Sequence, residues 1–268
     1  MQIIIYDNAQ QVAQNAALWV KELISKKPDP VLGLATGSTP ISLYKQLVEQ
    51  HKTKQISFKN VTTFNLDEYH HIAPENPQSY RSFMAENLFN HVDIDVKNTY
   101  LPTCAPGQNP REQGLAYEDK IKKQGGIDLQ ILGIGANGHI GFNEPTSSLS
   151  SRTRIKTLTQ QTISDNSRLF KSGEEQPTMA MTMGIATIMD ARYVLLMATG
   201  ANKANAVKDM ITGGVSAMCP ASALQMHENA IVLLDKAAAS ELSDHSYYQW
   251  ADNENRKLIE DYGYFHNY

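Results

Sequence analysis

Two adjacent carboxylates, Asp67 and Glu68, follow a short apolar run in residues 64–69 (FNLDEY). Neighbouring side chains on an extended chain point in opposite directions, so one carboxylate can face a crevice while the other serves the scaffold. A carboxylate in a crevice is a candidate general base when its surroundings tune its pKa. The same residues also fit a helix N-cap beside a solvated acid, and both interpretations stay open at this point.

A second polar group lies in residues 133–145 (GIGANGHIGFNEP), where four glycines within nine residues impose an unusual backbone path. We expect this path to gather Asn137, His139, Asn143 and Glu144. A lone histidine is more often structural than catalytic, but this one stands beside a carboxylate and two amides. Because imidazole titrates near neutrality, His139 is a candidate for shuttling a proton onto a ring oxygen.

The segment 34–40 (LATGSTP) predicts an anion site, because it is a strand end that runs into a turn of small residues and then a helix. Amides and hydroxyls at a helix N-terminus, here those of Gly37, Ser38 and Thr39, bind phosphate groups well. Turns of this composition also occur simply because they turn easily.

Two basic residues are candidates to complete the anion site. Arg168 lies in the segment ISDNSRLF, and Lys203 stands at the start of a predicted helix. A lysine in a first helical turn opposes the helix dipole, which an anion bound there would explain. The competing interpretation is an ordinary surface lysine.

Several other chemistries lack their motifs. The turn at 34–40 has neither GKS nor GKT after it, there is no GxGxxG, and GSTP does not fit G-x-S-x-G. His70 and His71 are adjacent and lack a matching ligand set, so no metal is expected. Cys104 and Cys219 show no ligand or CxxC spacing and are predicted to be reduced and structural.

The elements that must position these residues follow an alternating pattern. Strands are predicted near residues 2–6, 31–35, 61–66, 128–134, 193–198 and 230–234. Helices are predicted over 9–25, 42–52, 79–92, 110–125, 177–191 and 201–214. Runs such as VLGLA and YVLLMA are apolar on both alternations, as in strands covered by helices on both faces. The fold class is therefore α/β, a single Rossmann-like, doubly wound, mostly parallel sheet, whose ligands bind beyond the carboxyl ends of the strands.

Composition limits domain number and partners. The chain of 268 residues has no linker or repeat that would divide it, so residues 1–268 are predicted to form one domain. Its aromatic-rich end, about 245–268, is expected either to dock on the body or a neighbouring subunit, or to form a last helix covering the sheet.

With 24 basic and 28 acidic residues and no basic stripe, nucleic acid is not an expected partner. With no membrane span or signal sequence, the protein is predicted to be cytoplasmic.

Taken together, the segments LATGSTP, FNLDEY, LGIGANGHIGFNEP and SSLSSRTRIKTL, in this order, resemble the motifs of the glucosamine-6-phosphate deaminase family. The resemblance extends from the first predicted strand to the tyrosine-rich tail. It implies a cofactor-free and metal-free conversion of glucosamine 6-phosphate into fructose 6-phosphate and ammonia, in the catabolism of N-acetylglucosamine.

The resemblance also implies roles for the candidate residues. His139 would open the pyranose ring with help from Glu144 and Asn137, and Asp67 would remove the C2 proton. The substrate phosphate would be held by Gly37, Ser38, Thr39, Arg168 and Lys203. Some family members carry Asp where this chain has Asn137, and an amide can orient the imidazole but cannot supply a charge. We therefore expect His139 to be less basic here than in a relative with Asp.

The family includes homohexamers activated by N-acetylglucosamine 6-phosphate at an inter-subunit site. The residues of this chain that match the site are Ser147, Arg154, Lys156 and, with looser alignment, Tyr247. Two cations with hydroxyls are suited to an anion. Alternatively, SSRTRIK is a charged, solvated strand.

Three other functions remain as alternatives. A 6-phosphogluconolactonase or a sugar-phosphate isomerase of related fold would share the loop around His139, although FNLDEY and the FNEP of residues 142–145 favour the deaminase. A sugar-phosphate-sensing regulatory domain would share the phosphate turn but would not require Asp67, His139 and Glu144. Such regulators usually carry a DNA-binding helix-turn-helix, whereas this sequence starts with a predicted strand.

Overall fold

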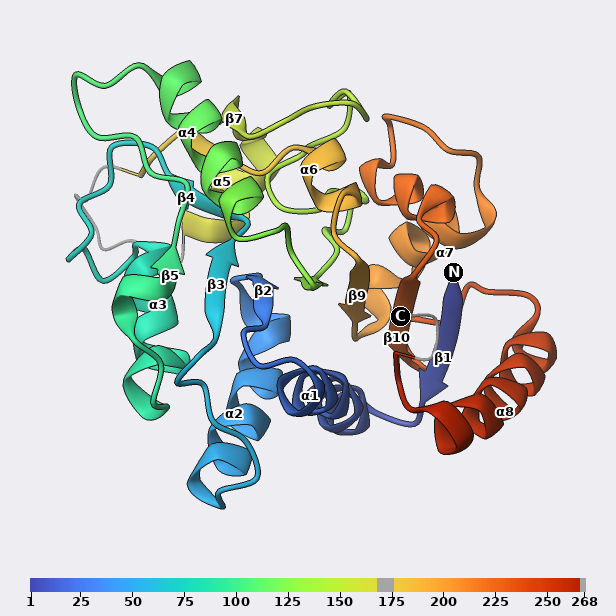
Figure 1. Cartoon of the computed structure of the whole chain (residues 1–268). Coiled ribbons are helices and arrows are strands. Elements are labelled where there is room, and N and C mark those ends of the chain that lie inside the picture. Colours follow the sequence, from blue (N-terminus) through green and yellow to red (C-terminus); the bar gives the residue numbers. More distant parts are fainter. Residues whose placement is uncertain (168–175, 266–268) are drawn as a thin grey trace.

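A parallel sheet forms the centre of the computed structural model, which describes residues 1–167 and 176–265 (Figure 1). Within these residues seven strands pair in the order β1-β10-β9-β6-β2-β3-β5. Their bounds are β1 Gln2–Tyr6, β2 Val31–Leu34, β3 Thr62–Asn65, β5 Thr99–Tyr100, β6 Leu129–Leu132, β9 Tyr193–Ala198 and β10 Ala230–Asp235. The six predicted strands are all present, and the two-residue edge strand β5 is an addition.

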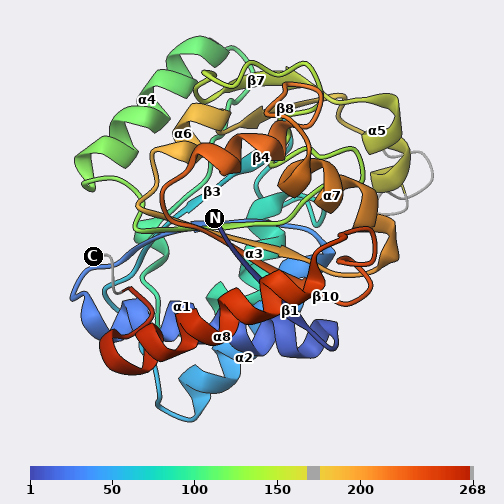
Figure 2. The same cartoon turned by 90° about the vertical axis from the view of Figure 1, so that its right-hand side faces the viewer.

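Helices cover both faces of this sheet. One apolar cluster joins it to α1 (Ala9–Lys26), α2 (Ser38–Lys52) and α3 (Tyr80–Asn87). The other joins it to α4 (Pro110–Lys123), α6 (Ile185–Met189) and α7 (Ala204–Thr212). Figure 2 shows α1 and α2 on one side and α4, α6 and α7 on the other. Alternate residues of one strand serve the two clusters, as Leu233 and Leu234 of β10 do, so the predicted doubly wound fold is confirmed.

A small antiparallel sheet stands beyond the carboxyl end of β3 and was not predicted. It has the order β4-β8-β7, with β4 Asp67–Tyr69, β7 Arg154–Thr157 and β8 Met179–Thr182. The helix predicted over 177–191 is therefore wrong in its first half, and only α6 within it is α-helical. Methionine and alanine favour helices, but pairing of β8 with β4 and β7 on both sides satisfies its backbone and overrides that local preference.

Other predicted helices differ at their ends. The segment 79–92 forms α3 and then a 3₁₀ turn at Phe89–His91, and 201–214 opens with a 3₁₀ turn at Ala201–Lys203 before α7. Helix α5 (Gln160–Ser167) was not predicted. Further 3₁₀ turns lie at Val96–Asn98 and Pro220–Met226.

The aromatic-rich tail forms helix α8 (His245–Tyr262), which packs against the edge strand β1 (Figure 1). After the helix, Tyr264 and Phe265 meet the ring of Trp19 with centroid distances of 4.7 and 5.4 Å. Phe265 also contacts the ring of Tyr193. The tail is thus docked on the body of its own chain, while Tyr247 and other apolar side chains of α8 stay exposed, namely Trp250, Leu258 and Tyr262.

The amino end of the sheet is held by a buried charge. Asp128, immediately before β6, has a fully buried side chain and accepts hydrogen bonds from Lys27, Arg192 and the amide of Val31. A buried carboxylate of this kind is stable only with such partners. The predicted site residues lie at the opposite, carboxyl end of the sheet.

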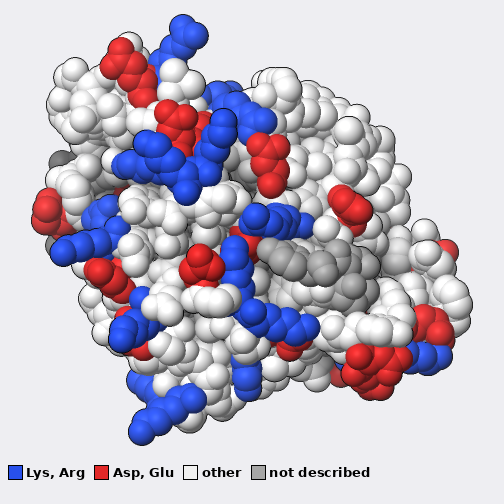
Figure 3. Space-filling view, viewed as in Figure 1, with Lys and Arg blue, Asp and Glu red and all other residues white. Residues whose placement is uncertain are grey.

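Charges are mixed on the surface shown in Figure 3, where Lys and Arg lie among Asp and Glu. In the part of the chain that the structure describes, no helix has the length and apolar character needed to cross a membrane.

Candidate active site

The predicted site residues follow the carboxyl ends of neighbouring parallel strands. The turn 35–37 follows β2, Asp67 lies two residues beyond the end of β3, and the glycine-rich loop 133–145 follows β6. Because β3, β2 and β6 are adjacent in the sheet, these loops meet at one edge. Lys203 lies beyond β9, the next strand along, and so stands at the same edge.

Asp67 is buried at the start of β4, with 5% of its surface exposed. Burial, followed by the charge of neighbouring Glu68, raises its pKa to about 8. Among the described residues, no hydrogen-bond donor reaches its carboxyl group to oppose this shift. Asp67 therefore holds a proton readily and is positioned to accept and return one near neutral pH.

Glu68, the adjacent carboxylate, serves the scaffold. It accepts hydrogen bonds from the amides of Tyr69, Tyr80 and Arg81 at 2.9, 2.9 and 3.0 Å, and the last two belong to the first turn of α3. Its side chain thus satisfies amides that the helix leaves without partners. Glu68 is therefore the carboxylate that serves the scaffold, and the role of Asp67 as the base stays a prediction.

Two glycines of the loop 133–145 leave room for site residues, one for the ring of His139 and one for the carboxyl group of Asp67. A Cβ on Gly135 would lie 2.2 Å from the ring of His139, so any side chain there would displace the imidazole. Gly141 has a φ of 56°, and a Cβ there would lie 3.3 Å from Oδ2 of Asp67. The glycine spacing therefore brings the histidine loop directly against the buried aspartate.

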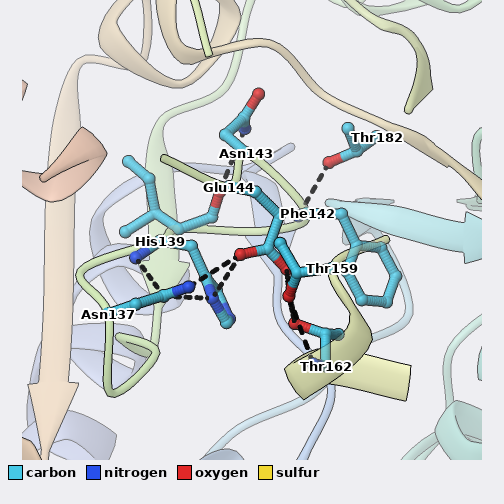
Figure 4. A network of polar contacts seen from close by, with 9 residues as sticks. Asn137, His139, Phe142, Asn143, Glu144, Thr159, Thr162 and Thr182 are labelled. Atoms are coloured by element: carbon cyan, nitrogen blue, oxygen red, sulfur yellow. Dashed lines mark hydrogen bonds and ion pairs between the residues drawn. The ribbon is translucent and has the colours of Figure 1, made fainter. Parts of the chain in front are cut away.

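Asn137, His139 and Glu144 form a hydrogen-bonded chain (Figure 4). The amide nitrogen of Asn137 lies 2.9 Å from Oε2 of Glu144, and its oxygen lies 2.7 Å from Nδ1 of His139. Nδ1 is also 3.3 Å from Oε2 of Glu144. Asn143 has a different role: it is fully buried, donates to the carbonyls of Ile140 and Met183, and holds the loop in place.

The direction of these hydrogen bonds assigns the protons. An ionised carboxylate only accepts, so the Asn137 amide must present its NH₂ to Glu144 and its oxygen to His139. Nδ1 of His139 must then carry a hydrogen, which in the neutral ring leaves the lone pair on Nε2. Nε2 is therefore the atom that can accept a proton from a ligand.

Glu144 is buried, yet it is held in its ionised form. Burial alone would raise its pKa, but hydrogen bonds and charge from His139, together with donors on Thr162 and Asn137, lower it to about 2. Its negative charge lies beside the imidazole and supplies the charge that the Asn137 amide lacks. The expectation that His139 is less basic than in relatives with Asp stays a prediction.

The predicted anion site is only partly described. Gly37 is the N-cap of α2 and has a φ of 102°. It has no side chain to cap the helix, and Ser38 and Thr39 form the first turn. Near Lys203, the amide of Gly200 donates to the buried Asp235 at 3.0 Å, which fixes the loop after β9. Arg168, the remaining predicted phosphate ligand, lies outside the described residues.

The predicted allosteric residues occupy two places. Arg154 and Lys156 are half-buried in β7, where Arg154 donates to Asn143 at 2.9 Å, and Ser147 is buried in the loop before that strand. Tyr247 is in α8, which lies far from β7 in both Figures 1 and 2. One chain therefore does not bring Tyr247 to the other three.

Thr159 and Thr162 are site residues that the sequence reasoning missed. Both hydroxyls reach Oε1 of Glu144, the oxygen on the side away from Asn137 (Figure 4). Their sequence signal is weak, because it consists only of one threonine three residues before another at the start of a short polar helix. In the described part of the chain, no group of three or more His, Cys, Asp or Glu side chains could hold a metal ion.

Comparison with known proteins places these motifs in one family. Residues 6–233 match the family described as glucosamine-6-phosphate isomerases/6-phosphogluconolactonase. The chain is 73% identical over 268 residues to the glucosamine-6-phosphate deaminase of Colwellia psychrerythraea, which covers all of both chains.

Solved structures agree with this match. The chain is 41% identical, with a TM-score of 0.86, to a structure described as a monomeric glucosamine-6-phosphate deaminase, covering 90% of this chain and all of that one. It also shares its fold, at 19% identity and a TM-score of 0.69, with the 6-phosphogluconolactonase of Leishmania guyanensis, covering 90% of this chain and 98% of that one.

The raised pKa of Asp67 predicts a pH-dependent stability. Its pKa in the folded protein, about 8, exceeds the unfolded value of roughly 4, so folding is favoured by its protonated form. The contribution is fully present below pH 4 and is lost as pH rises toward 8. Asp67→Asn removes this loss, so the free energy of unfolding of the variant relative to wild type should rise by roughly 4 kcal/mol between pH 4 and pH 7.

Urea unfolding at both pH values measures this change. The exposed Asp29, before β2, offers a matched control in Asp29→Asn, which should show no such trend. A constant difference between Asp67→Asn and wild type across this range would show that Asp67 titrates at its ordinary value.

Proposed function

This chain belongs to the family of glucosamine-6-phosphate isomerases and 6-phosphogluconolactonases, and we propose that it converts glucosamine 6-phosphate and water into fructose 6-phosphate and ammonia. The observation that carries the proposal is the pair of buried carboxyl groups with opposite pKa shifts, Asp67 upward and Glu144 downward. Two proton transfers at different atoms require two separately tuned groups. The lactonase alternative shares the family description and the fold of structures that are 19% identical, whereas the relative at 73% identity is a deaminase.

Ring opening comes first and is the work of His139. Nε2 accepts the proton of the anomeric hydroxyl, the bond between C1 and the ring oxygen breaks, and the ring oxygen receives a proton from the imidazolium. Asn137 fixes the tautomer through Nδ1, and ionised Glu144 stabilises the transient positive charge. The open-chain aldehyde then has an acidified proton at C2.

Isomerisation follows at Asp67. Its carboxylate removes the C2 proton to give an enolamine, and the proton is delivered to C1, which leaves an iminium group at C2. Water adds to that carbon, ammonia leaves, and the ketose remains. A buried aspartate that gives up and regains a proton near neutrality suits both transfers.

The substrate itself would help to ionise this base. Glucosamine 6-phosphate carries an ammonium group on C2, next to the proton that is removed. A positive charge beside Asp67 lowers the pKa of that carboxyl group and opposes the effect of burial. Asp67 therefore becomes a carboxylate when the substrate is in place.

The phosphate group would be held at the N-terminus of α2. The amides and hydroxyls of Gly37, Ser38 and Thr39 supply donors, and Arg168 and Lys203 supply positive charge. This arrangement matters because the overall charge of the chain is -4 and does not attract an anion.

Regulation and assembly extend the proposal. Ser147, Arg154 and Lys156 would bind N-acetylglucosamine 6-phosphate as an activator, and Tyr247 would come from a neighbouring subunit of a homohexamer. The exposed aromatic side chains on α8 support a contact between copies, with Tyr247 and Trp250 more than half exposed. We further infer one catalytic domain that works in the cytoplasm without metal or cofactor.

Release of ammonia and fructose 6-phosphate from glucosamine 6-phosphate tests the reaction. Wild type should produce both in equal amounts with no metal added. Asp67→Asn should lower kcat by about a thousandfold because it lacks the base, whereas Asp29→Asn should keep its activity. An inactive wild type, with or without N-acetylglucosamine 6-phosphate, would refute the proposed reaction.

Substrate saturation tests the regulatory proposal. In wild type, N-acetylglucosamine 6-phosphate should lower the half-saturating concentration of glucosamine 6-phosphate by roughly fivefold, within the usual range of allosteric coupling. Lys156→Ala should abolish the shift because it removes one of the two cations, and Lys59→Ala, at an exposed position, should not. A hyperbolic curve that does not respond to the activator would contradict the proposal.

A further inference from the structure

The carboxylate of Glu144 is held from both sides. Oε2 receives the amide of Asn137 at 2.9 Å and lies 3.3 Å from Nδ1 of His139. Oε1 receives the hydroxyl of Thr162, and Thr159 lies at 3.4 Å. Figure 4 shows the threonines approaching from the α5 side and the relay residues from the other.

The two threonines also build the first turn of α5. The hydroxyl oxygen of Thr159, just before the helix, accepts a hydrogen bond from the amide of Thr162 at 3.2 Å, which is the bond of an N-cap. The two hydroxyl oxygens lie 3.0 Å apart. The start of α5 is thus bound to Glu144 by side chains that are themselves oriented by the helix.

We propose that Thr162 is a positioning residue for proton transfer by His139. A carboxylate can rotate about its terminal bond, which would turn its plane away from Asn137 and His139. The Thr162 hydroxyl retains Oε1 on the α5 side, so that Oε2 stays against Asn137 and His139. This inference rests on the proposed function, because it assigns a role within the same relay.

The hydrogen bond from Thr162 to Glu144 matters because both side chains are buried. Thr162 and Glu144 are 7% and 2% exposed, so water cannot readily replace the hydroxyl when it is removed. A buried carboxylate that loses a donor becomes harder to ionise, and its preferred orientation is lost with it. Docking of α5 on Glu144 is therefore a condition for an efficient ring-opening step.

Thr162→Val tests the role because valine keeps the shape and removes the hydroxyl. Thr162→Ser restores the donor, and Thr187→Val is a matched control that removes another largely buried threonine-to-carboxylate bond, of 2.6 Å, to Glu118. Thr162→Val should lower kcat by about tenfold and change the ¹⁵N signals of the His139 ring, because the carboxylate beside that ring loses its fixed orientation. Thr162→Ser should restore both, and Thr187→Val should leave the ring signals in place.

Two results would overturn the inference. One is an unchanged kcat together with unchanged ¹⁵N signals of the His139 ring in Thr162→Val. The other is an equal loss of kcat in Thr162→Val and Thr187→Val with the ring signals unchanged in both, which would indicate a structural role only.

A measurement without turnover separates this inference from the proposed function. If wild type releases no ammonia, the proposed function fails, and ¹⁵N NMR of the His139 ring still reports on the relay. His139→Gln identifies the signals of that ring by their loss. Thr162→Val should change the balance of the two ring nitrogens, and identical spectra in wild type and variant would refute the positioning role.

Discussion

Burial acts on Asp67 and Glu144 alike, but the two carboxyl groups differ in the donors that surround them. Glu144 receives hydrogen bonds from Asn137 and Thr162 and lies beside the imidazole of His139, so it remains ionised in spite of burial. Asp67 faces the added charge of Glu68 and retains a proton to higher pH. In the proposed reaction, this contrast lets one buried site perform two proton transfers.

The fold keeps the two groups close while their environments differ. Asp67 is fixed by the small sheet, where β4 pairs with β8, and Glu144 belongs to the loop after β6. Gly141 lets that loop pass against Asp67 without a side chain between them. At the opposite end of the sheet, Asp128 forms ion pairs with Lys27 and Arg192, which stabilise the amino ends of the strands. The candidate site lies at their carboxyl ends.

Much of the fold and of the candidate site could be predicted from sequence, because long apolar strands and glycine-rich loops leave clear local patterns. The fold class, six of the seven strands of the parallel sheet and the clustering of Asn137, His139 and Glu144 follow from such patterns. The strand β8 could not be predicted, since its methionines favour a helix locally and only pairing with β4 and β7 makes a strand. Thr162 was missed because its role depends on a contact across 18 residues of chain.

Titration of the two carboxyl carbons by ¹³C NMR in the free protein tests the contrast most directly, with Asp67→Asn and Glu144→Gln used to assign the signals. The account predicts that the carboxyl carbon of Asp67 titrates with a pKa near 8 and that of Glu144 near 2. Two carboxyl groups that both titrate near their ordinary values of roughly 4 would contradict it.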